Sequence, residues 1–246
     1  MAVTPARPPP RDAPTIPGGE HAIGAGRFRD LTVEAFVERL ASSEPVPGGG
    51  SAAAIAGSLG AALVAMVAGL SAGRERYAAH AATHVEAGAL GRRLADRFLA
   101  LADEDAAAYA VFAAAMKLPR GTDDEKAARG EALRSAARVA AEVPLACVEA
   151  CLELVSATEA LAGRSNRNAS SDLSVASYLA EAAARSAAEN VLVNLPSVGD
   201  PSWAADVTER VTALLGRVES LAAATREVVR AGIERDPPPA GGLLEA

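Results

Sequence analysis

Apolar residues recur at helical spacing along most of the chain, and no stretch alternates apolar and polar residues as a half-buried strand does. The first clear pattern places Val33, Phe36, Val37 and Leu40 at i, i+3, i+4 and i+7. This spacing predicts a short amphipathic helix, which must end before Pro45 because proline cannot continue it.

Five longer helical segments follow, separated by glycines, prolines or polar capping residues. Their predicted ranges are 51–72, 76–117, 122–162, 172–195 and 201–235. Thr122 with Glu125 forms a capping box, and Asp200 followed by Pro201 is a typical helix start. Together with the short first helix, these segments predict an all-α protein, an up-and-down bundle of about six long helices.

At three positions inside these segments we expect the helix to bend, kink or break. Gly88 and Gly91 are candidate bend points in the segment 76–117. Pro144 lies inside the segment 122–162, where we expect a break or kink because proline lacks the N–H that a helix uses.

The two ends of the chain lack any helical pattern and are rich in Pro, Gly and Ala. Residues 1–27 therefore predict a disordered extension, and residues 236–246 a disordered tail. The helical domain is expected to span residues 28–235.

The segment from Ser51 to Gly73 has no charged residue and is long enough to raise the question of a membrane span. It is built mainly of Ala, Gly and Ser, which are only weakly hydrophobic. Half of the 246 residues are hydrophobic, yet only 3% are aromatic, so the core must be made of small side chains. We therefore expect this segment to be the buried central helix of the bundle rather than a membrane helix.

Charge and metal-binding residues exclude several functions. The formal net charge of −7 and the absence of a basic run argue against nucleic acid as a partner. Cys147 and Cys151 lie four residues apart without a nearby histidine, so we interpret them as core residues and predict no metal site. The pair His80 and His84 lacks the glutamate of a zinc protease motif. Since no signal peptide is recognisable, we expect a cytoplasmic protein.

Three consecutive glycines, Gly48, Gly49 and Gly50, precede Ser51 at the start of the uncharged segment. A glycine-rich loop that opens a helix leaves backbone N–H groups free at the positive end of the helix dipole, and these groups favour an anionic ligand. Ser51 is a candidate cap of this helix. The glycines alone are equally compatible with a plain linker, and no lysine follows to make a phosphate loop.

Helical phase separates the three neighbouring acids Asp103, Glu104 and Asp105. Steps of three and four residues from Asp105 meet only apolar residues and a tyrosine, namely Phe98, Leu101, Tyr109, Phe112 and Met116. The same steps from Asp103 meet Asp96, Leu99 and mostly alanines, and from Glu104 they meet Arg97, so these two acids are expected closer to a solvated face. A carboxyl group on an apolar face has a raised pKa, which suits general acid–base catalysis. Asp105 is therefore the catalytic candidate, the alternative being a buried acid satisfied by Tyr109 or a backbone donor.

The segment 172–195 carries a second polar face, on which Asp172, Asn190 and Asn194 are spaced by small residues. Such a face can form the floor of a ligand groove, but asparagines also commonly form hydrogen bonds between helices. Basic residues that could contact an anion lie nearby in sequence, at Arg74, Arg76, Arg164 and Arg167.

Four segments, in this order and spacing, resemble the cyclodeaminase/cyclohydrolase family of folate enzymes. They are PVPGGGSAAA, SAGRERY, DEDAAAYAVFAAAMKLP and SNRNASSDLSVASYLAEAAARSAAENVLVNL. The family includes the cyclodeaminase half of formiminotransferase-cyclodeaminase and stand-alone methenyltetrahydrofolate cyclohydrolases. The resemblance covers about residues 28–235.

The resemblance implies a helical homodimer that binds a tetrahydrofolate derivative as substrate, without metal or further cofactor and with no membrane or nucleic-acid partner. It maps the family's catalytic acid onto Asp105. It also implies that the folate site is lined by Gly48, Gly49, Gly50 and Ser51, by Arg74 and Tyr77, and by Asp172 and Asn190.

The chain departs from the family pattern at three positions. Ser165, which precedes Asn166, Ser174 and Ser186 stand where the family usually has glycine. The added side chains bear on the size of the pocket and on the substrate.

The expected reaction is the conversion of 5-formiminotetrahydrofolate to 5,10-methenyltetrahydrofolate and ammonia. One alternative is hydrolysis of 5,10-methenyltetrahydrofolate. Another is a folate-binding or dimerisation module without catalysis. This alternative is considered because the three serines depart from the family pattern.

Overall fold

The computed structural model describes residues 26–238, and all regular structure in them is helical. The elements are η1 (Phe28–Asp30), α1 (Val33–Leu40), α2 (Gly49–Ser71), η2 (Glu75–His80), α3 (Ala81–Met116), α4 (Asp123–Leu161), η3 (Arg167–Ala169), α5 (Ser170–Val198) and α6 (Pro201–Ala231). The all-α prediction is therefore confirmed. The predicted disordered ends lie almost wholly outside the described residues.

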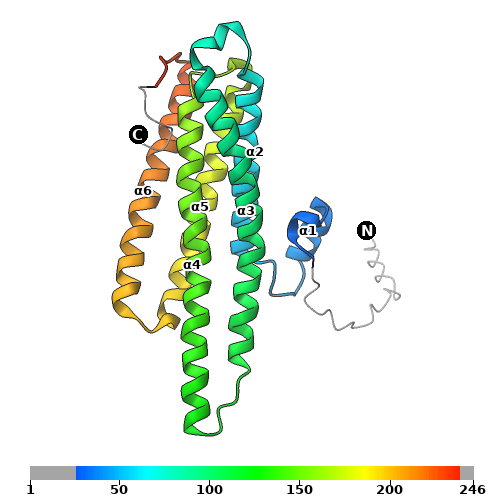
Figure 1. Cartoon of the computed structure of the whole chain (residues 1–246), viewed down its shortest axis with the longest axis vertical. Coiled ribbons are helices and arrows are strands. Elements are labelled where there is room, and N and C mark those ends of the chain that lie inside the picture. Colours follow the sequence, from blue (N-terminus) through cyan, green and yellow to red (C-terminus); the bar gives the residue numbers. More distant parts are fainter. Residues whose placement is uncertain (1–25, 239–246) are drawn as a thin grey trace, which may run out of the picture.

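Five long helices, α2 to α6, run up and down beside one another, while the short helix α1 lies against one side of this bundle (Figure 1). At the lower end in the figure, the connection between α3 and α4 projects beyond the other helices. The capping box at Thr122 and the cap at Asp200 are both present, at the starts of α4 and α6. These signals were local in the sequence, which explains why the helix starts were predicted well.

Helix α2 packs against α3, α4 and α5 through small residues. A Cβ added at Gly91 of α3 would lie 2.8 Å from the carbonyl oxygen of Ala61 and 2.9 Å from the nitrogen of Ala65. The glycines of α3 thus let the backbones approach closely, and α3 continues through Gly88 and Gly91 as a single helix. The structure thus gives Gly91 a role in close packing between α3 and α2.

The face of α2 that carries Leu59, Met66 and Leu70 is exposed. By length and composition α2 could cross a membrane, and half of its most apolar window is buried inside the bundle. The prediction of a buried central helix is therefore correct for one face of α2 and wrong for the other. Within the single chain, nothing among the described residues covers the apolar side chains of this face.

Helix α4 continues through Pro144, where a break or kink was expected. Proline cannot donate to the carbonyl of Ala140 four residues earlier. The side chain of Asn194 on α5 donates to that oxygen instead, over 2.9 Å. Asn194 therefore satisfies the carbonyl that Pro144 leaves free, as an interhelix hydrogen bond of the kind the sequence allowed.

Helix α6 ends at Ala231, four residues earlier than predicted, because Gly232 adopts a left-handed conformation with φ of 63°. The following residues form a segment, 233–236, that returns to the end of α4. The N–H of Arg235 donates to the carbonyl of Gly163 over 3.0 Å, and Nε of Arg164 donates to the carbonyl of Asp236 over 2.5 Å. The chain after α6 is thus fixed to the turn between α4 and α5.

Candidate active site

The start of α2 meets the side chain of Asp105 on α3. The hydroxyl of Ser51 donates to Oδ2 of Asp105 over 2.9 Å and lies 3.2 Å from the carbonyl oxygen of Ala102. Ser51 was a candidate helix cap, but the capping position is Gly48, which offers no side chain. Ser51 is fully buried and orients the carboxyl group instead.

Gly50 lies directly against this carboxyl group. A Cβ at Gly50 would overlap with the oxygens of Asp105 and lie 2.6 Å from its Cγ. Only a glycine therefore allows the backbone of α2 to come so close to Asp105. This contact explains one of the three consecutive glycines by packing rather than by chain flexibility.

Burial raises the pKa of Asp105, and hydrogen bonds from the hydroxyl and backbone N–H of Ser51 partly oppose this effect. The two neighbouring acids are engaged elsewhere. Asp103 accepts a hydrogen bond from the N–H of Phe28 over 2.7 Å, and Glu104 pairs with Arg97 over 2.5 Å. Helical phase thus identified the desolvated acid correctly.

The apolar face predicted around Asp105 is only half buried. Phe98 and Leu101 are fully buried, but Tyr109 and Met116 are 40% and 45% exposed. The last turns of α3 belong to the projecting end of the bundle, where few helices remain to cover them (Figure 1). Tyr109 is not a hydrogen-bond partner of Asp105, because Ser51 takes that role.

A small cavity of about 10 Å³ adjoins the carboxyl group, with walls from Gly50, Leu101, Pro144 and Cys147. Such a volume holds about one water molecule. Cys147 and Cys151 are buried and free, as predicted for core residues. Within residues 26–238 no three His, Cys, Asp or Glu side chains cluster as a metal site requires.

Asn190 on α5 lies beside the glycine loop. A Cβ at Gly49 would be 3.7 Å from Nδ2 of Asn190, and this amide donates to the carbonyl of Ser186 in the same helix over 2.8 Å. The structure therefore brings six of the predicted site residues together at this end of α2. They are Gly48, Gly49, Gly50, Ser51, Asp105 and Asn190.

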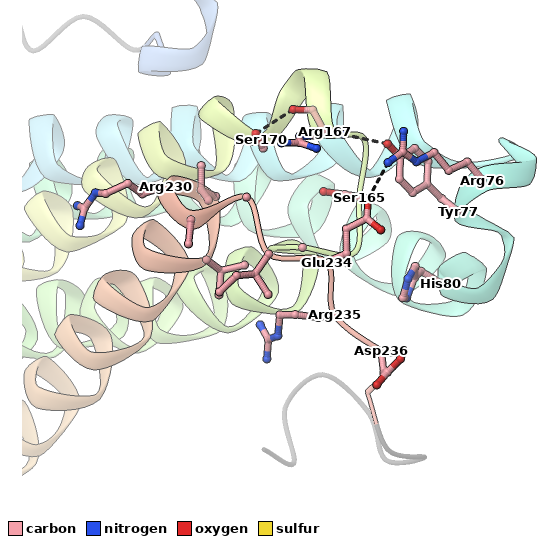
Figure 2. A pocket seen from close by; sticks show the side chains of 16 residues that line it. Arg76, Tyr77, His80, Ser165, Arg167, Ser170, Arg230, Glu234, Arg235 and Asp236 are labelled. Atoms are coloured by element: carbon pink, nitrogen blue, oxygen red, sulfur yellow. Dashed lines mark hydrogen bonds and ion pairs between the residues drawn. The ribbon is translucent and has the colours of Figure 1, made fainter.

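Three other predicted site residues, Arg74, Tyr77 and Asp172, lie at the opposite end of α2. The 23 residues of α2 separate Arg74 from Gly48 by about 30 Å, since a helix rises about 1.5 Å per residue. There the hydroxyl of Tyr77 accepts a hydrogen bond from the N–H of Arg167 over 3.1 Å (Figure 2). Within a single chain, the predicted folate-site residues therefore form two separate groups, one around Asp105 and one around Tyr77.

The three serines that depart from the family pattern are also divided. Ser186 lies one helical turn from Asn190, near the Asp105 group. Ser165 lines a cavity at the opposite end, beside Tyr77 (Figure 2). Ser174 lies in α5, where its carbonyl accepts from the hydroxyl of Ser177. Only Ser186 is therefore close enough to bear on the space near Asp105.

Sequence reasoning missed the residues that α4 contributes, Pro144 and Cys147. Pro144 was interpreted as a helix breaker and Cys147 as plain core. A proline that interrupts a long apolar helix was the available signal, because such positions often mark a local feature that the fold must satisfy.

Comparison with known proteins adds to this geometry. The family model described as formiminotransferase-cyclodeaminase matches residues 32–213. The chain belongs to the cyclodeaminase/cyclohydrolase family. The match includes the glycine loop, Asp105 and Asn190, so the resemblance seen in the sequence is confirmed.

Relatives in this family differ in length and in name. A methenyltetrahydrofolate cyclohydrolase from Methylorubrum extorquens is 37% identical over 202 residues, which cover 82% of this chain and 97% of that protein. A formimidoyltransferase-cyclodeaminase from Sus scrofa is also 37% identical, over 76% of this chain but only 35% of its own length. The chain therefore spans about a third of the pig protein and nearly all of the bacterial one.

The fold agrees with a solved structure, that of formiminotetrahydrofolate cyclodeaminase from Thermotoga maritima. The TM-score is 0.75, with 23% identity, over 82% of this chain and 98% of that one. Because only 23% of the aligned residues are identical, this similarity supports the fold and carries no statement about the reaction. Since the relatives are named for two reactions, the comparisons do not favour the expected cyclodeaminase over a cyclohydrolase.

Proposed function

We propose that this chain is an enzyme that acts on the one-carbon group of a tetrahydrofolate, with Asp105 as the acid–base group. The observation that carries the proposal is the desolvated Asp105 carboxyl, which is held by Ser51 and lies against Gly50. A raised pKa lets one carboxyl group accept and return a proton near neutral pH.

Hydrolysis of 5,10-methenyltetrahydrofolate is the first candidate reaction. Water attacks the methenyl carbon, and the Asp105 carboxylate accepts its proton. The bond from this carbon to N5 then breaks, N5 receives a proton from Asp105, and 10-formyltetrahydrofolate and one net proton result. The cavity beside Asp105, with room for about one water molecule, supports this reaction, as does the name of the full-length bacterial relative.

Cyclodeamination of 5-formiminotetrahydrofolate is the second candidate. N10 attacks the formimino carbon, Asp105 transfers the proton of N10 to the departing nitrogen, and ammonia leaves with a second proton from solution. The product is 5,10-methenyltetrahydrofolate. The match to formimidoyltransferase-cyclodeaminases supports this reaction.

The test compares both substrates with the wild-type chain and the variant Asp105→Asn. We expect turnover of at least one substrate by the wild type, followed through methenyl absorbance and ammonia release, and a loss of about a hundredfold or more in the variant. Asp206→Asn, at an exposed position of α6, is the matched control. Undiminished turnover in Asp105→Asn would remove Asp105 from the mechanism, and folate binding without turnover would favour a non-catalytic module.

We also propose that the active form is a homodimer in which each folate site uses both chains. Arg74, Tyr77 and Asp172 are too far from Asp105 to reach one folate within a chain. The exposed apolar face of α2, with Leu59, Met66 and Leu70, runs between the two groups. Two copies paired across this face in antiparallel fashion would bring the Tyr77 end of one chain to the Asp105 end of the other.

Mixing two inactive variants tests this arrangement. If Asp105→Asn and Asp172→Asn each abolish turnover, half of the randomly mixed dimers carry one intact site, so about a quarter of wild-type activity should return. Two copies of Asp105→Asn bearing different tags serve as the control and should regain nothing. Failure of the mixture to regain activity, with dimers present, would show that each site lies within one chain.

A further inference from the structure

A cavity of about 410 Å³ lies at the end of the bundle remote from Asp105 (Figure 2). Its walls come from η2, from the turn before α5, and from the segment 233–236. This last wall is held in place by the two hydrogen bonds that tie it to Gly163 and Arg164. The cavity is therefore built from segments that are fixed to one another.

Positive charge is concentrated around this cavity, although the chain as a whole has a formal charge of −7. Its lining includes four arginines and two acids, namely Arg76, Arg167, Arg230, Arg235, Glu234 and Asp236. Arg76 pairs with Glu234 over 2.6 Å, and Arg235 pairs with Glu159 over 2.5 Å. Within residues 26–238, neither Arg167 nor Arg230 has an ion-pair partner, so both guanidinium groups remain available to a ligand. Arg167 lies in the same turn as Ser165, and its backbone N–H bonds to Tyr77.

Two hydroxyl groups accompany this guanidinium. Ser165 is only 8% exposed, and its hydroxyl has no hydrogen-bond partner among the described residues. Tyr77 accepts a bond from the N–H of Arg167, which leaves its own O–H free to donate. The hydroxyl of Ser165 is not fully buried, so it can bond to a ligand in the cavity. Nδ1 of His80, in the same wall, is buried without a hydrogen-bond partner among the described residues, whereas buried polar groups nearly always have one. Figure 2 shows Ser165, Tyr77 and Arg167 around the same cavity.

The third group at this wall adds no charge. Burial, followed by the nearby His84 and Arg164, lowers the pKa of His80, so the ring is neutral near physiological pH. The cavity thus offers hydrogen-bond donors and planar guanidinium groups free of ion pairs, the combination that matches the oxygens of a carboxylate or phosphate.

We propose that this cavity binds a small oxyanion, a carboxylate or phosphate group, through the guanidinium of Arg167 and the hydroxyls of Ser165 and Tyr77. The inference deepens the proposed folate site, to which Tyr77 already belongs, and in that respect rests on the proposed function, although binding here requires no turnover at Asp105. It also gives a role to Ser165, one of the three positions where this chain departs from the family pattern by gaining a side chain.

The test measures binding of inorganic phosphate and of p-aminobenzoylglutamate to the full chain at constant ionic strength, by calorimetry and by the rise in the unfolding midpoint. We expect saturable binding of at least one anion. Arg167→Gln should weaken it about tenfold or more, since hydrogen bonds to charged groups are the strong ones. Ser165→Gly, which removes only the hydroxymethyl group, should weaken it severalfold. Arg217→Gln, an exposed arginine of α6 outside the cavity, should leave it unchanged.

The two ligands distinguish the sources of the anion. Tighter binding of p-aminobenzoylglutamate would identify the glutamate of a folate, whereas tighter binding of phosphate would identify a free or metabolite phosphate. Absence of binding by both anions would overturn the proposal, as would an equal loss in Arg217→Gln and Arg167→Gln. Ser165→Gly removes only a hydroxymethyl group, so we expect this variant to fold. Its binding of the two anions therefore still tests the proposal if Arg167→Gln does not fold. The test measures anion binding and not turnover, so its result can be told apart from a failure of the proposed reaction.

Discussion

The two ends of α2 hold polar groups in opposite ways. At Asp105 the surroundings are uncharged, mainly small or apolar residues and one serine, and among the described residues burial and Ser51 account for the shift of its pKa. At the other end, arginines and acids form ion pairs around an open cavity. An arginine beside Asp105 would lower its pKa and spoil it as a proton donor. The length of α2 keeps the cations away from the acid.

The largest expected effect comes from breaking the contact between Gly50 and Asp105. Gly50→Ala places a Cβ on the carboxyl group, which must move away from Ser51. We expect kcat/KM to fall about a hundredfold or more, since misplaced acid–base groups lose most of their effect. In Gly216→Ala, at an exposed position of α6, the new Cβ meets nothing within 4 Å, so this variant should keep full turnover and gain up to about 1 kcal/mol of stability. Equal turnover in the two variants would contradict the geometric role of Gly50.

A second change removes a hydrogen bond from the same end. Asn194→Ala leaves the carbonyl of Ala140 unpaired, and we expect a loss of about 1–3 kcal/mol in the free energy of unfolding. In Pro144→Ala the helix supplies its own N–H to that carbonyl, so adding Asn194→Ala should then cost about 1 kcal/mol less. Denaturant unfolding of the four proteins in this cycle measures the coupling. Strictly additive losses would mean that Asn194 does not compensate for the proline.

The charge of Asp105 should show in the pH dependence of stability. Burial raises its pKa in the folded chain above the unfolded value near 3.8, so the folded state loses stability as the pH rises through this interval. Asp105→Asn lacks that loss. Its unfolding midpoint should therefore exceed that of the wild type by a margin that grows with pH and becomes constant above the folded pKa. A margin independent of pH, or the same trend in Asp206→Asn, would contradict burial as the cause.

The smallest effect is expected at the charged end. Glu159→Gln removes the ion pair with Arg235, whose side chain is partly exposed, and should cost at most about 1 kcal/mol. Turnover at Asp105 should not change, because neither residue of the pair is among the proposed folate-binding residues. Unfolding in low and high salt checks the first statement, and the folate assay the second. A large loss of turnover would show that this end of the bundle acts on an Asp105 site, either of its own chain or of the partner in the proposed dimer.

Much of this arrangement followed from patterns within single helices. The phase of Asp105 against Phe98 and Leu101 depends only on the helical period, and it was correct. The role of Ser51 was missed, because a hydroxyl in the first turn of a helix can cap that helix or reach a neighbour, and only the packing of α2 on α3 decides. The distance between Arg74 and Gly48 was available from the length of α2, yet a resemblance that names site residues carries no information on which chain supplies them.

The exposed end of α3 shows a second limit of sequence patterns. Tyr109 and Met116 continue the apolar face of Asp105, but α3 and α4 extend past their neighbours, so these residues are exposed. A periodic pattern indicates which side of a helix is apolar and does not indicate how far along the helix a partner extends.

The small side chains of the bundle also affect how the site beside Asp105 responds when empty. Leucine or phenylalanine lining a void can change rotamer and fill it, whereas Gly50, Ala54 and Ala187 have no rotamers to change. Folding consequently fixes little side-chain entropy at these positions. This part of the wall next to the carboxyl group is therefore set by helix spacing and keeps the same shape before and after a ligand arrives, whereas Leu101 and Val143 of the same wall can change rotamer.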